Sequence, residues 1–138
     1  MITIRKQEIV KFEDVLHLYQ AVGWTNYTNQ PQMLEQALYH SLVIYLALDG
    51  DAVVDLIRLA GDGFSSVFVQ DLIVLSSYQR QGIGSSLMKQ ALGNFKEAYQ
   101  VQLATEQTEK NVGFNRSMSF EILFTYNCIG MTWINREK

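Results

Sequence analysis

The chain has 138 residues, of which 48% are hydrophobic and 18% charged, as in a folded globular protein and unlike a disordered one. Its formal net charge of -3 argues against nucleic acid as a main partner, because proteins that bind nucleic acid usually present a basic face. With one cysteine, two histidines and no apolar run of the ~20 residues that span a membrane, we expect a single cytoplasmic domain over residues 1–138 with no disulfide, metal or membrane span.

Two helices are expected after a first strand. Ile2–Arg5 alternates apolar and polar residues, which is typical of a strand. Glu13–Val22 carries apolar residues at helical spacing, and Gly23 ends that helix. Pro31 suits the first turn of a second helix, which we expect to run to about Ser41.

Three strands are expected next, separated by turns that contain aspartate and glycine. They cover Leu42–Leu48, Ala52–Leu59 and Ser66–Leu75. The third strand is almost continuously apolar, which indicates that it is covered on both faces and lies centrally in the sheet.

The second half of the chain adds helices and shorter strands. We expect a helix over Gly84–Lys96, a strand over Val101–Ala104, a helix over Glu109–Met118 and closing strands over Ile122–Tyr126 and Ile129–Ile134. The strands on either side of the first of these helices should be parallel and joined by a right-handed crossover. The predicted fold class is α+β with a mixed sheet.

A polar turn with two glycines leads from the long strand into the helix, and it reads Gln79-Arg80-Gln81-Gly82-Ile83-Gly84. The first turn of a helix has N–H groups without intrahelical partners and a partial positive charge, and glycine lets a ligand approach the backbone. These features suit a pyrophosphate, and Arg80 adds a positive charge. The residues alone leave open that the glycines only shape a tight turn. Leu87 stands where a Rossmann motif needs its third glycine, and the lysine of a P-loop is missing.

The spacing Gln79-x-x-Gly82-x-Gly84 after a buried strand, in this order of elements, resembles the GNAT superfamily of Gcn5-related N-acetyltransferases. Residues 108–121 also look like the family's helix and turn before its sixth strand. The resemblance covers nearly the whole chain. It implies the GNAT acyl-CoA N-acyltransferase fold, an α/β/α sandwich with a mixed, mostly antiparallel sheet of about six to seven strands and about four helices.

Members of this family use acetyl-CoA as the donor. The resemblance implies that backbone N–H groups of the glycine turn bind the pyrophosphate, and that the pantetheine arm pairs with the fourth strand where the fourth and fifth strands separate. The cofactor-binding residues implied in this way are Leu72, Ile73, Val74, Gln79, Arg80, Gln81, Gly82, Ile83, Gly84, Ser85, Thr108 and Phe114.

The catalytic groups are less well defined. Many members use a tyrosine to protonate the leaving thiolate, but Asn115 stands at that position here and cannot act as an acid. Tyr126 on the next expected strand, or water, could take that role, and packing is the alternative role for Tyr126. Asp71 is the only carboxylate on the fourth strand, where the residue matching some members' base is Gln70. Asp71 is expected either to bind or deprotonate the amine or to form a structural ion pair.

The acceptor site is expected near Trp24, Asn26 and Tyr27, in the loop between the first two helices, although lid packing would also explain the aromatic residues. The predicted function is transfer of acetyl from acetyl-CoA to a primary amine of a small molecule or peptide, within a ternary complex. The alternatives are a non-catalytic acyl-CoA-binding or sensing module and a protein-interaction domain. A homodimer through the apolar C-terminal strands is open, and Asp55 has no explanation from the sequence.

Overall fold

The computed structural model describes residues 1–8 and 10–136 and contains two compact units, Met1–Leu103 and the residues from Ala104 on. In the first unit the strands are β1 (Ile2–Lys6), β2 (Val43–Asp49), β3 (Ala52–Gly61), β4 (Ser66–Val74) and β5 (Gln100–Leu103). Its helices are α1 (Phe12–Ala21), α2 (Thr25–Thr28), α3 (Pro31–Tyr39) and α4 (Ile83–Leu92), with 3-10 turns η1 (Ser76–Tyr78) and η2 (Gly93–Phe95). That residues 1–138 form a single domain stays a prediction.

The five strands form one mixed sheet in the order β1-β2-β3-β4-β5. β1, β2, β3 and β4 pair antiparallel in that order, as expected for β2, β3 and β4, which short turns join. β4 and β5 are parallel, which confirms the expected strand–helix–strand unit around α4. The position of β4 between β3 and β5 also confirms that the long apolar strand lies inside the sheet.

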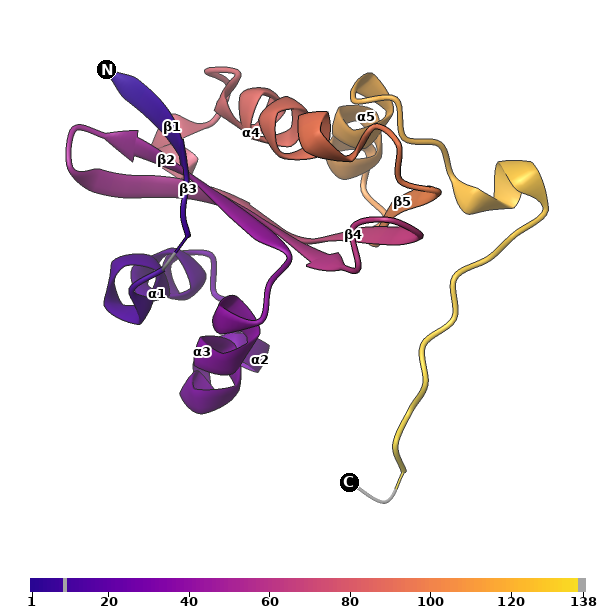
Figure 1. Ribbon diagram of the computed structural model, residues 1–138, viewed down its shortest axis with the longest axis horizontal. Helices are drawn as coiled ribbons and strands as arrows, with labels where there is room; N and C mark the ends of the chain where they lie inside the picture. The colour runs from indigo at the N-terminus through magenta and orange to yellow at the C-terminus, as the bar shows by residue number, and fades with distance from the viewer. Residues whose placement is uncertain (9, 137–138) are drawn as a thin grey trace. The chain divides into compact units, whose positions relative to one another are not determined.

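Helices cover both faces of this sheet (Figure 1): α1, α2 and α3 lie on one face and α4 lies on the other. Each helix buries the apolar side that its sequence spacing creates. Val15, Leu18 and Tyr19 of α1 are fully buried, and α4 buries Leu87 and Met88. The first unit is therefore the α/β/α sandwich that the sequence predicts.

The second unit contains helix α5 (Glu109–Ser117) and a 3-10 turn η3 (Leu123–Tyr126). The prediction of two closing strands over Ile122–Tyr126 and Ile129–Ile134 is wrong, because neither range forms a strand. Local bonds close a turn instead, from Asn127 N–H to Phe124 C=O at 3.0 Å and from Cys128 N–H to Leu123 C=O at 3.1 Å. Over residues 1–8 and 10–136 the sheet thus has five strands and not the expected six to seven.

Two smaller differences concern the helices. The loop expected between the first two helices contains α2, a single helical turn. The expected helix Gly84–Lys96 is divided into α4 and the 3-10 turn η2, which begins at Gly93.

In the described part of the chain, no cluster of three or more His, Cys, Asp and Glu residues is arranged to hold a metal ion. None of its helices combines the length and the apolar run that crossing a membrane requires.

Candidate functional site

The end of β4 is open along the edge that faces β5. The parallel pairing joins β4 to β5 only from Ser66 to Val69, opposite Gln100–Leu103. Gln70–Val74 continue the strand and pair with β3 on the other side. In the described chain these residues therefore have no neighbouring strand on the β5 side, and this is the separation of strands expected beside Leu72, Ile73 and Val74.

The glycine turn follows at once. η1 leads into a backbone with positive φ at two positions, 66° at Arg80 and 77° at Gly82. Gly82 is the residue before α4, and a Cβ atom there would meet no other atom within 4 Å. Glycine is therefore favoured at this position by the left-handed backbone conformation, and not by crowding from neighbouring atoms.

The first turn of α4 presents free backbone donors. Ser86 N–H bonds to Gly82 C=O at 3.0 Å and is the first N–H of this helix to do so. For Ile83, Gly84 and Ser85, no backbone acceptor is found among residues 1–8 and 10–136. The Ile83 side chain is buried and fixes the start of the helix, while Gly82 is exposed. Three aligned N–H groups at a helix start are an arrangement that can bind an anion.

Side-chain bonds hold the approach to this turn. Tyr78 donates its hydroxyl to Asp49 Oδ2 at 2.7 Å and so ties η1 to the end of β2. Gln79 Nε2 donates to Val74 C=O at 3.3 Å, and Gln81 Nε2 donates to Ser77 C=O at 3.4 Å. The bond between Tyr78 and Asp49 raises the pKa of the phenol and lowers the pKa of the carboxyl.

Asp55, which the sequence left unexplained, holds the last part of β4. It lies opposite Val74 in the sheet and is fully buried. Its Oδ1 accepts the Leu75 N–H at 2.9 Å, directly before η1. Its Oδ2 is buried and has no hydrogen-bond partner in the described part of the chain. Burial raises the pKa of this carboxyl to about 6, and the Leu75 N–H opposes part of that rise.

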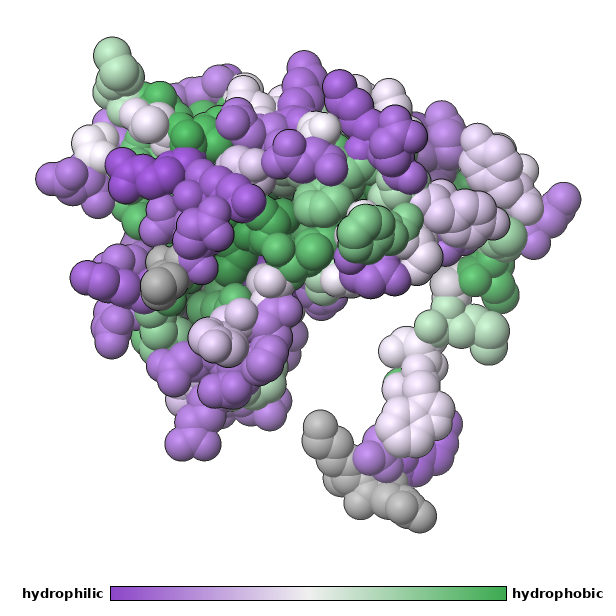
Figure 2. Space-filling model, viewed as in Figure 1, coloured by the Kyte–Doolittle hydropathy of each residue, from purple (hydrophilic) through white to green (hydrophobic). Residues whose placement is uncertain are grey.

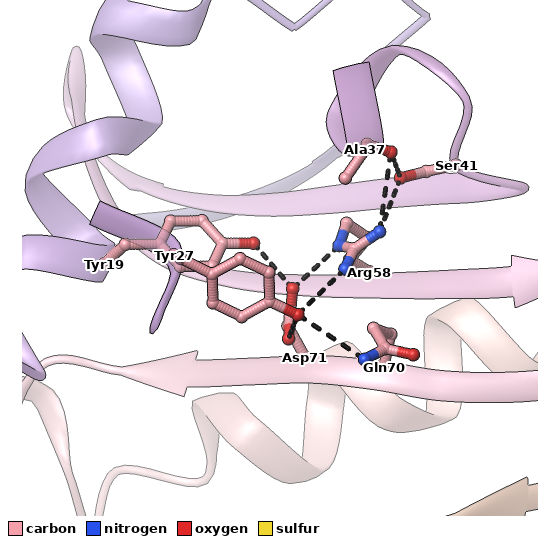
Figure 3. A network of polar contacts seen from close by, with 7 residues as sticks. All are labelled: Tyr19, Tyr27, Ala37, Ser41, Arg58, Gln70 and Asp71. Carbon is pink, nitrogen blue, oxygen red and sulfur yellow. Dashed lines mark hydrogen bonds and ion pairs between the residues drawn. The ribbon is translucent and has the colours of Figure 1, made fainter. Parts of the chain in front are cut away.

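A bulge in β4 brings Gln70 and Asp71 together. The register passes from Leu59 opposite Val69 to Arg58 opposite Asp71, so Gln70 is one extra residue in the strand. Both side chains point toward Tyr27 of α2 (Figure 3). The Tyr27 hydroxyl donates to Asp71 Oδ1 at 2.9 Å and accepts from Gln70 Nε2 at 3.4 Å.

Asp71 is the centre of a buried polar network (Figure 3), which takes its members from the sheet and from α1 and α2. Tyr19 donates its hydroxyl to Asp71 Oδ2 at 2.8 Å, and Arg58 Nε forms an ion pair with the same oxygen at 2.7 Å. Asp71, Arg58 and Tyr19 are each at most 5% exposed. The structure therefore satisfies both carboxylate oxygens of Asp71 within the protein, as a buried charge requires.

Arg58 extends the network to α3. Its Nη1 donates to Ala37 C=O at 3.4 Å and to Ser41 Oγ at 3.3 Å, and its Nη2 donates to Tyr27 Oη at 3.1 Å. Burial, together with the neighbouring Asp71 carboxylate, raises the pKa of Tyr19 and of Tyr27. These contacts favour the structural ion pair among the roles that the sequence left open for Asp71.

The three residues expected at the acceptor site lie in and beside α2. Trp24 and Tyr27 pack with Tyr19, with ring centroids 6.0 Å and 5.1 Å from that of Tyr19. Tyr27 is buried, Trp24 is half-buried and Asn26 is exposed. Packing thus explains Tyr27 and much of Trp24, while the side chain of Asn26 is open to solvent.

The other expected site residues belong to the second unit. Thr108 caps α5, since its Oγ1 accepts the Asn111 N–H at 3.1 Å. Asn115 donates through Nδ2 to Asn111 C=O at 3.0 Å, and Phe114 is half-buried. Tyr126 lies on η3 with 66% of its surface exposed, and not on a strand.

Sequence reasoning missed Arg58 and Tyr19 as partners of Asp71. One signal was available for Arg58, because it is the only basic residue in the apolar strand Ala52–Leu59, just as Asp71 is the only acid in β4. Two opposite charges that are both buried in adjacent strands are expected to pair. Tyr19 gives no such signal, since its position suits the apolar side of α1 equally well.

Comparison with known proteins identifies the family. Residues 40–122 match the model of the acetyltransferase (GNAT) domain. A solved structure of a GNAT-family acetyltransferase protein from Streptococcus pneumoniae is 85% identical over 99% of both chains, with a TM-score of 0.92. The chain therefore belongs to the GNAT family of acetyltransferases, and the predicted fold is confirmed. No curated protein sequence matches the chain.

More distant solved structures share the fold. A PaiA N-acetyltransferase from Thermoplasma acidophilum, solved in complex with coenzyme A, is 18% identical over 88% of this chain and 91% of its own, with a TM-score of 0.68. An aminoglycoside acetyltransferase from an uncultured soil metagenomic sample, solved in complex with sisomicin, is 17% identical over 98% of this chain and 97% of its own, with a TM-score of 0.71.

Proposed function

We propose that this GNAT protein transfers the acetyl group of acetyl-CoA directly to a primary amine of a small molecule or peptide. The observation that carries the proposal is made on the described residues: N–H groups at the start of α4 have no backbone acceptor, and the last residues of the preceding strand β4 have no neighbouring strand on one side. The coenzyme A complex of the PaiA relative and the sisomicin complex of the aminoglycoside relative support this choice of donor and acceptor.

The coenzyme binds in two parts. The backbone of Gln79–Ser85 binds the pyrophosphate through its N–H groups, with the Arg80 guanidinium adding a positive charge. Leu72, Ile73 and Val74 receive the pantetheine arm along the open edge of β4, as an added strand would be received. Thr108 and Phe114 are assigned to the coenzyme by the resemblance to the family.

The reaction forms one bond and breaks another. The amine nitrogen attacks the thioester carbonyl carbon, so that a C–N bond forms as the C–S bond breaks. The thioester oxygen gains negative charge and is stabilised by a backbone N–H of β4, for which we assign Val74. The nitrogen loses a proton to water or a carboxylate, and the thiolate gains one from water or Tyr126. Trp24, Asn26 and Tyr27 line the acceptor side, where Asn26 is the exposed member.

A second candidate function is that of an acyl-CoA-binding or sensing module without catalysis. Two observations favour it. Asn115 replaces the tyrosine that serves many family members as an acid, and both oxygens of Asp71 are engaged by Tyr19, Tyr27 and Arg58. The same coenzyme site serves the enzyme and the sensor, so acetyl-CoA binding is expected of both and only amine-dependent turnover separates them.

The binding test is calorimetric titration of the full chain with acetyl-CoA. Gly82→Asp should abolish binding while the fold is kept, because a carboxylate beside the pyrophosphate repels it and the space around this position is open. Gly50→Asp is the matched control, since Gly50 also has a positive φ of 62° and open space but lies in the turn between β2 and β3. If the Gly82→Asp variant and the wild type bind acetyl-CoA with equal affinity, the start of α4 is not the pyrophosphate site.

The kinetic test measures release of free coenzyme A with a panel of amines. Acceleration by an amine supports the enzyme, and binding without amine-dependent release supports the sensor. Asp71→Asn then separates the roles of Asp71. A structural ion pair predicts a loss of about 3 kcal/mol in the free energy of unfolding, with activity that follows the folded fraction. A base predicts a lower kcat at neutral pH in protein that is still folded, with acetyl-CoA affinity retained.

A further inference from the structure

Asp55 lies on the same face of the sheet as α4. Its neighbour Leu56 belongs to the core that packs against α1, α2 and α3, and successive residues of a strand point to opposite faces. Val74, which lies opposite Asp55, follows Ile73, and Ile73 belongs to the same core as Leu56. The Asp55 carboxyl is therefore on the α4 face, at the end of β4 from which the chain continues through η1 and the glycine turn into α4.

The surroundings of this carboxyl are apolar. α4 packs on β2 and β3 through its buried side, which includes Ile83 and Leu87. The space-filling view shows hydrophobic residues between the hydrophilic outer side of α4 and the sheet (Figure 2). Asp55 is 0% exposed, its Oδ1 accepts the Leu75 N–H at 2.9 Å, and its Oδ2 has no hydrogen-bond partner in the described part of the chain. An ionised carboxylate is costly in such surroundings.

Among residues 1–8 and 10–136, no ion pair with a neighbouring group neutralises Asp55. The ionisable side chains on β3 and on the elements packed against Asp55 are Tyr45, Asp49, Arg58, Asp71, Tyr78, Arg80 and Lys89. Arg58 and Asp71 pair with each other on the opposite face, and Asp49 is bonded to Tyr78. The two remaining cations are exposed. Burial therefore raises the pKa of Asp55 to about 6, opposed by the Leu75 N–H.

Asp55 acts on the glycine turn in two ways. Its bond to the Leu75 N–H fixes the direction in which the chain leaves β4, directly before η1. Its charge, when present, lies on the same face of the sheet as the N–H groups of Ile83–Ser85, for which the described residues supply no backbone acceptor. A negative charge there opposes a bound pyrophosphate, and apolar surroundings screen that repulsion poorly. The neutral acid keeps the bond without the repulsion.

We propose that Asp55 is a positioning residue of the coenzyme site, which favours acetyl-CoA binding in its neutral form and opposes it in its ionised form. Linkage is reciprocal, so a pyrophosphate that prefers neutral Asp55 also raises the pKa of Asp55 when it binds. The affinity for acetyl-CoA then falls as pH rises through that pKa. This inference rests on the proposed function, because it needs acetyl-CoA to bind at the glycine turn.

The test is calorimetric titration of the full chain with acetyl-CoA at about pH 5 and about pH 7.5, on either side of the pKa of Asp55. Asp55→Asn keeps an oxygen for the Leu75 N–H and has no charge, so it resembles the neutral acid. It should bind like the wild type at the lower pH and about tenfold more tightly than the wild type at the higher pH. Asp51→Asn is the matched control, since it removes the same charge from an exposed position and should bind like the wild type at both.

The outcomes separate this inference from the proposed function. If the wild type binds and Asp55→Asn changes the affinity by the same factor at both pH values, or not at all, the role of Asp55 is structural and the inference is wrong. An Asp51→Asn variant that gains as much affinity as Asp55→Asn would assign the effect to net charge and also contradict it. A wild type that does not bind acetyl-CoA at either pH overturns the proposed function together with the inference.

A count of protons gives a second measurement. Titrations in two buffers with different ionisation enthalpies measure the protons taken up as acetyl-CoA binds. Near pH 6.5 the wild type should take up about half a proton more than Asp55→Asn, because binding raises the pKa of Asp55. The phosphates of the ligand contribute equally to both proteins and cancel in the difference. Equal uptake would mean that Asp55 and the pyrophosphate are not coupled, since a purely structural role alters affinity without altering the number of protons.

Discussion

Asp55 and Asp71 are both buried carboxylates in neighbouring strands, yet their surroundings are opposite. Asp71 accepts from Tyr19, Tyr27 and Arg58, so its charge is compensated. Asp55 has one backbone donor, Leu75 N–H, and an Oδ2 atom for which the described residues supply no partner. Burial of an uncompensated carboxylate favours its neutral form, and for this reason the pKa of Asp55 rises to about 6.

This difference predicts how stability depends on pH. The pKa of Asp55 is raised from its ordinary 3.8 to about 6 in the folded protein. Between these values the folded state binds more protons than the unfolded state, so this group's contribution to stability falls as pH rises through that window. Above about pH 6 the ionised group destabilises the fold by on the order of 3 kcal/mol. Asp55→Asn should therefore gain stability relative to the wild type as pH rises, measured by urea unfolding at pH 4.5 and 7.5.

The control for this prediction is Asp51→Asn, which changes an exposed aspartate four residues earlier in the turn between β2 and β3. Its stability difference from the wild type, measured at the same two pH values, is the reference for replacing an exposed aspartate. An Asp55→Asn variant with the same stability difference at both pH values would show that the carboxyl titrates in the ordinary range, and that water reaches Oδ2.

Between β3 and β4, the turn depends on a glycine for a steric reason. Gly61 has φ of 126°, and a Cβ atom there would lie 2.3 Å from Ser66 C=O. Because that neighbour is backbone of the paired strand, it cannot move without opening the pairing. Gly61→Ala should therefore lower the free energy of unfolding by on the order of 3 kcal/mol or more.

Gly50→Ala provides the comparison, since Gly50 has φ of 62° and no atom within 4 Å of a Cβ. Only the left-handed conformation opposes alanine there, at a cost of about 1 kcal/mol. Chemical denaturation of both variants measures the difference between the two losses. Equal losses would mean that the backbone conformation alone explains Gly61.

Most elements of the first unit could be predicted because local pattern and tertiary need agree. β2, β3 and β4 are apolar runs bounded by turns, and α4 has an apolar side that the sheet buries. The prediction of two C-terminal strands was wrong because there local pattern and tertiary structure disagree. Their residues favour extended structure, but a strand also needs a neighbour to accept its hydrogen bonds, and sequence pattern does not say whether one exists. The residues around Leu123 form a local turn instead.

The candidate site also has one part that the sequence predicts and one part that it does not. The glycine turn was predictable because its function lies in the backbone of one continuous segment, Gln79–Ser85. The Asp71 network was not, because its members come from five separate elements and meet only through the fold. The bulge at Gln70, which turns two adjacent side chains toward Tyr27, leaves no mark in the sequence.

At the scale of the whole molecule, the two compact units differ in how much they bury. α4 buries four of its residues, whereas α5 buries none. Helices in water owe most of their stability to packing of an apolar side, and short helices without it are marginal. Protection from solvent exchange should therefore be unequal along the chain, with β2, β3, β4 and α4 the most protected and α5 far less.

Hydrogen exchange of the full chain, read by mass spectrometry with and without acetyl-CoA, measures this difference. Without the ligand, amides of α5 should exchange orders of magnitude faster than those of α4, since only local opening is needed. Acetyl-CoA should slow exchange at Ile83–Ser85 by occupying the N–H groups that have no backbone acceptor in the described chain, and should slow α5 if Thr108 and Phe114 contact the coenzyme as proposed. Slowing at the turn with no change in α5 would confine the coenzyme site to the first unit and withdraw those two residues from it. No slowing at either place, at a ligand concentration that saturates binding, would mean that acetyl-CoA binds elsewhere.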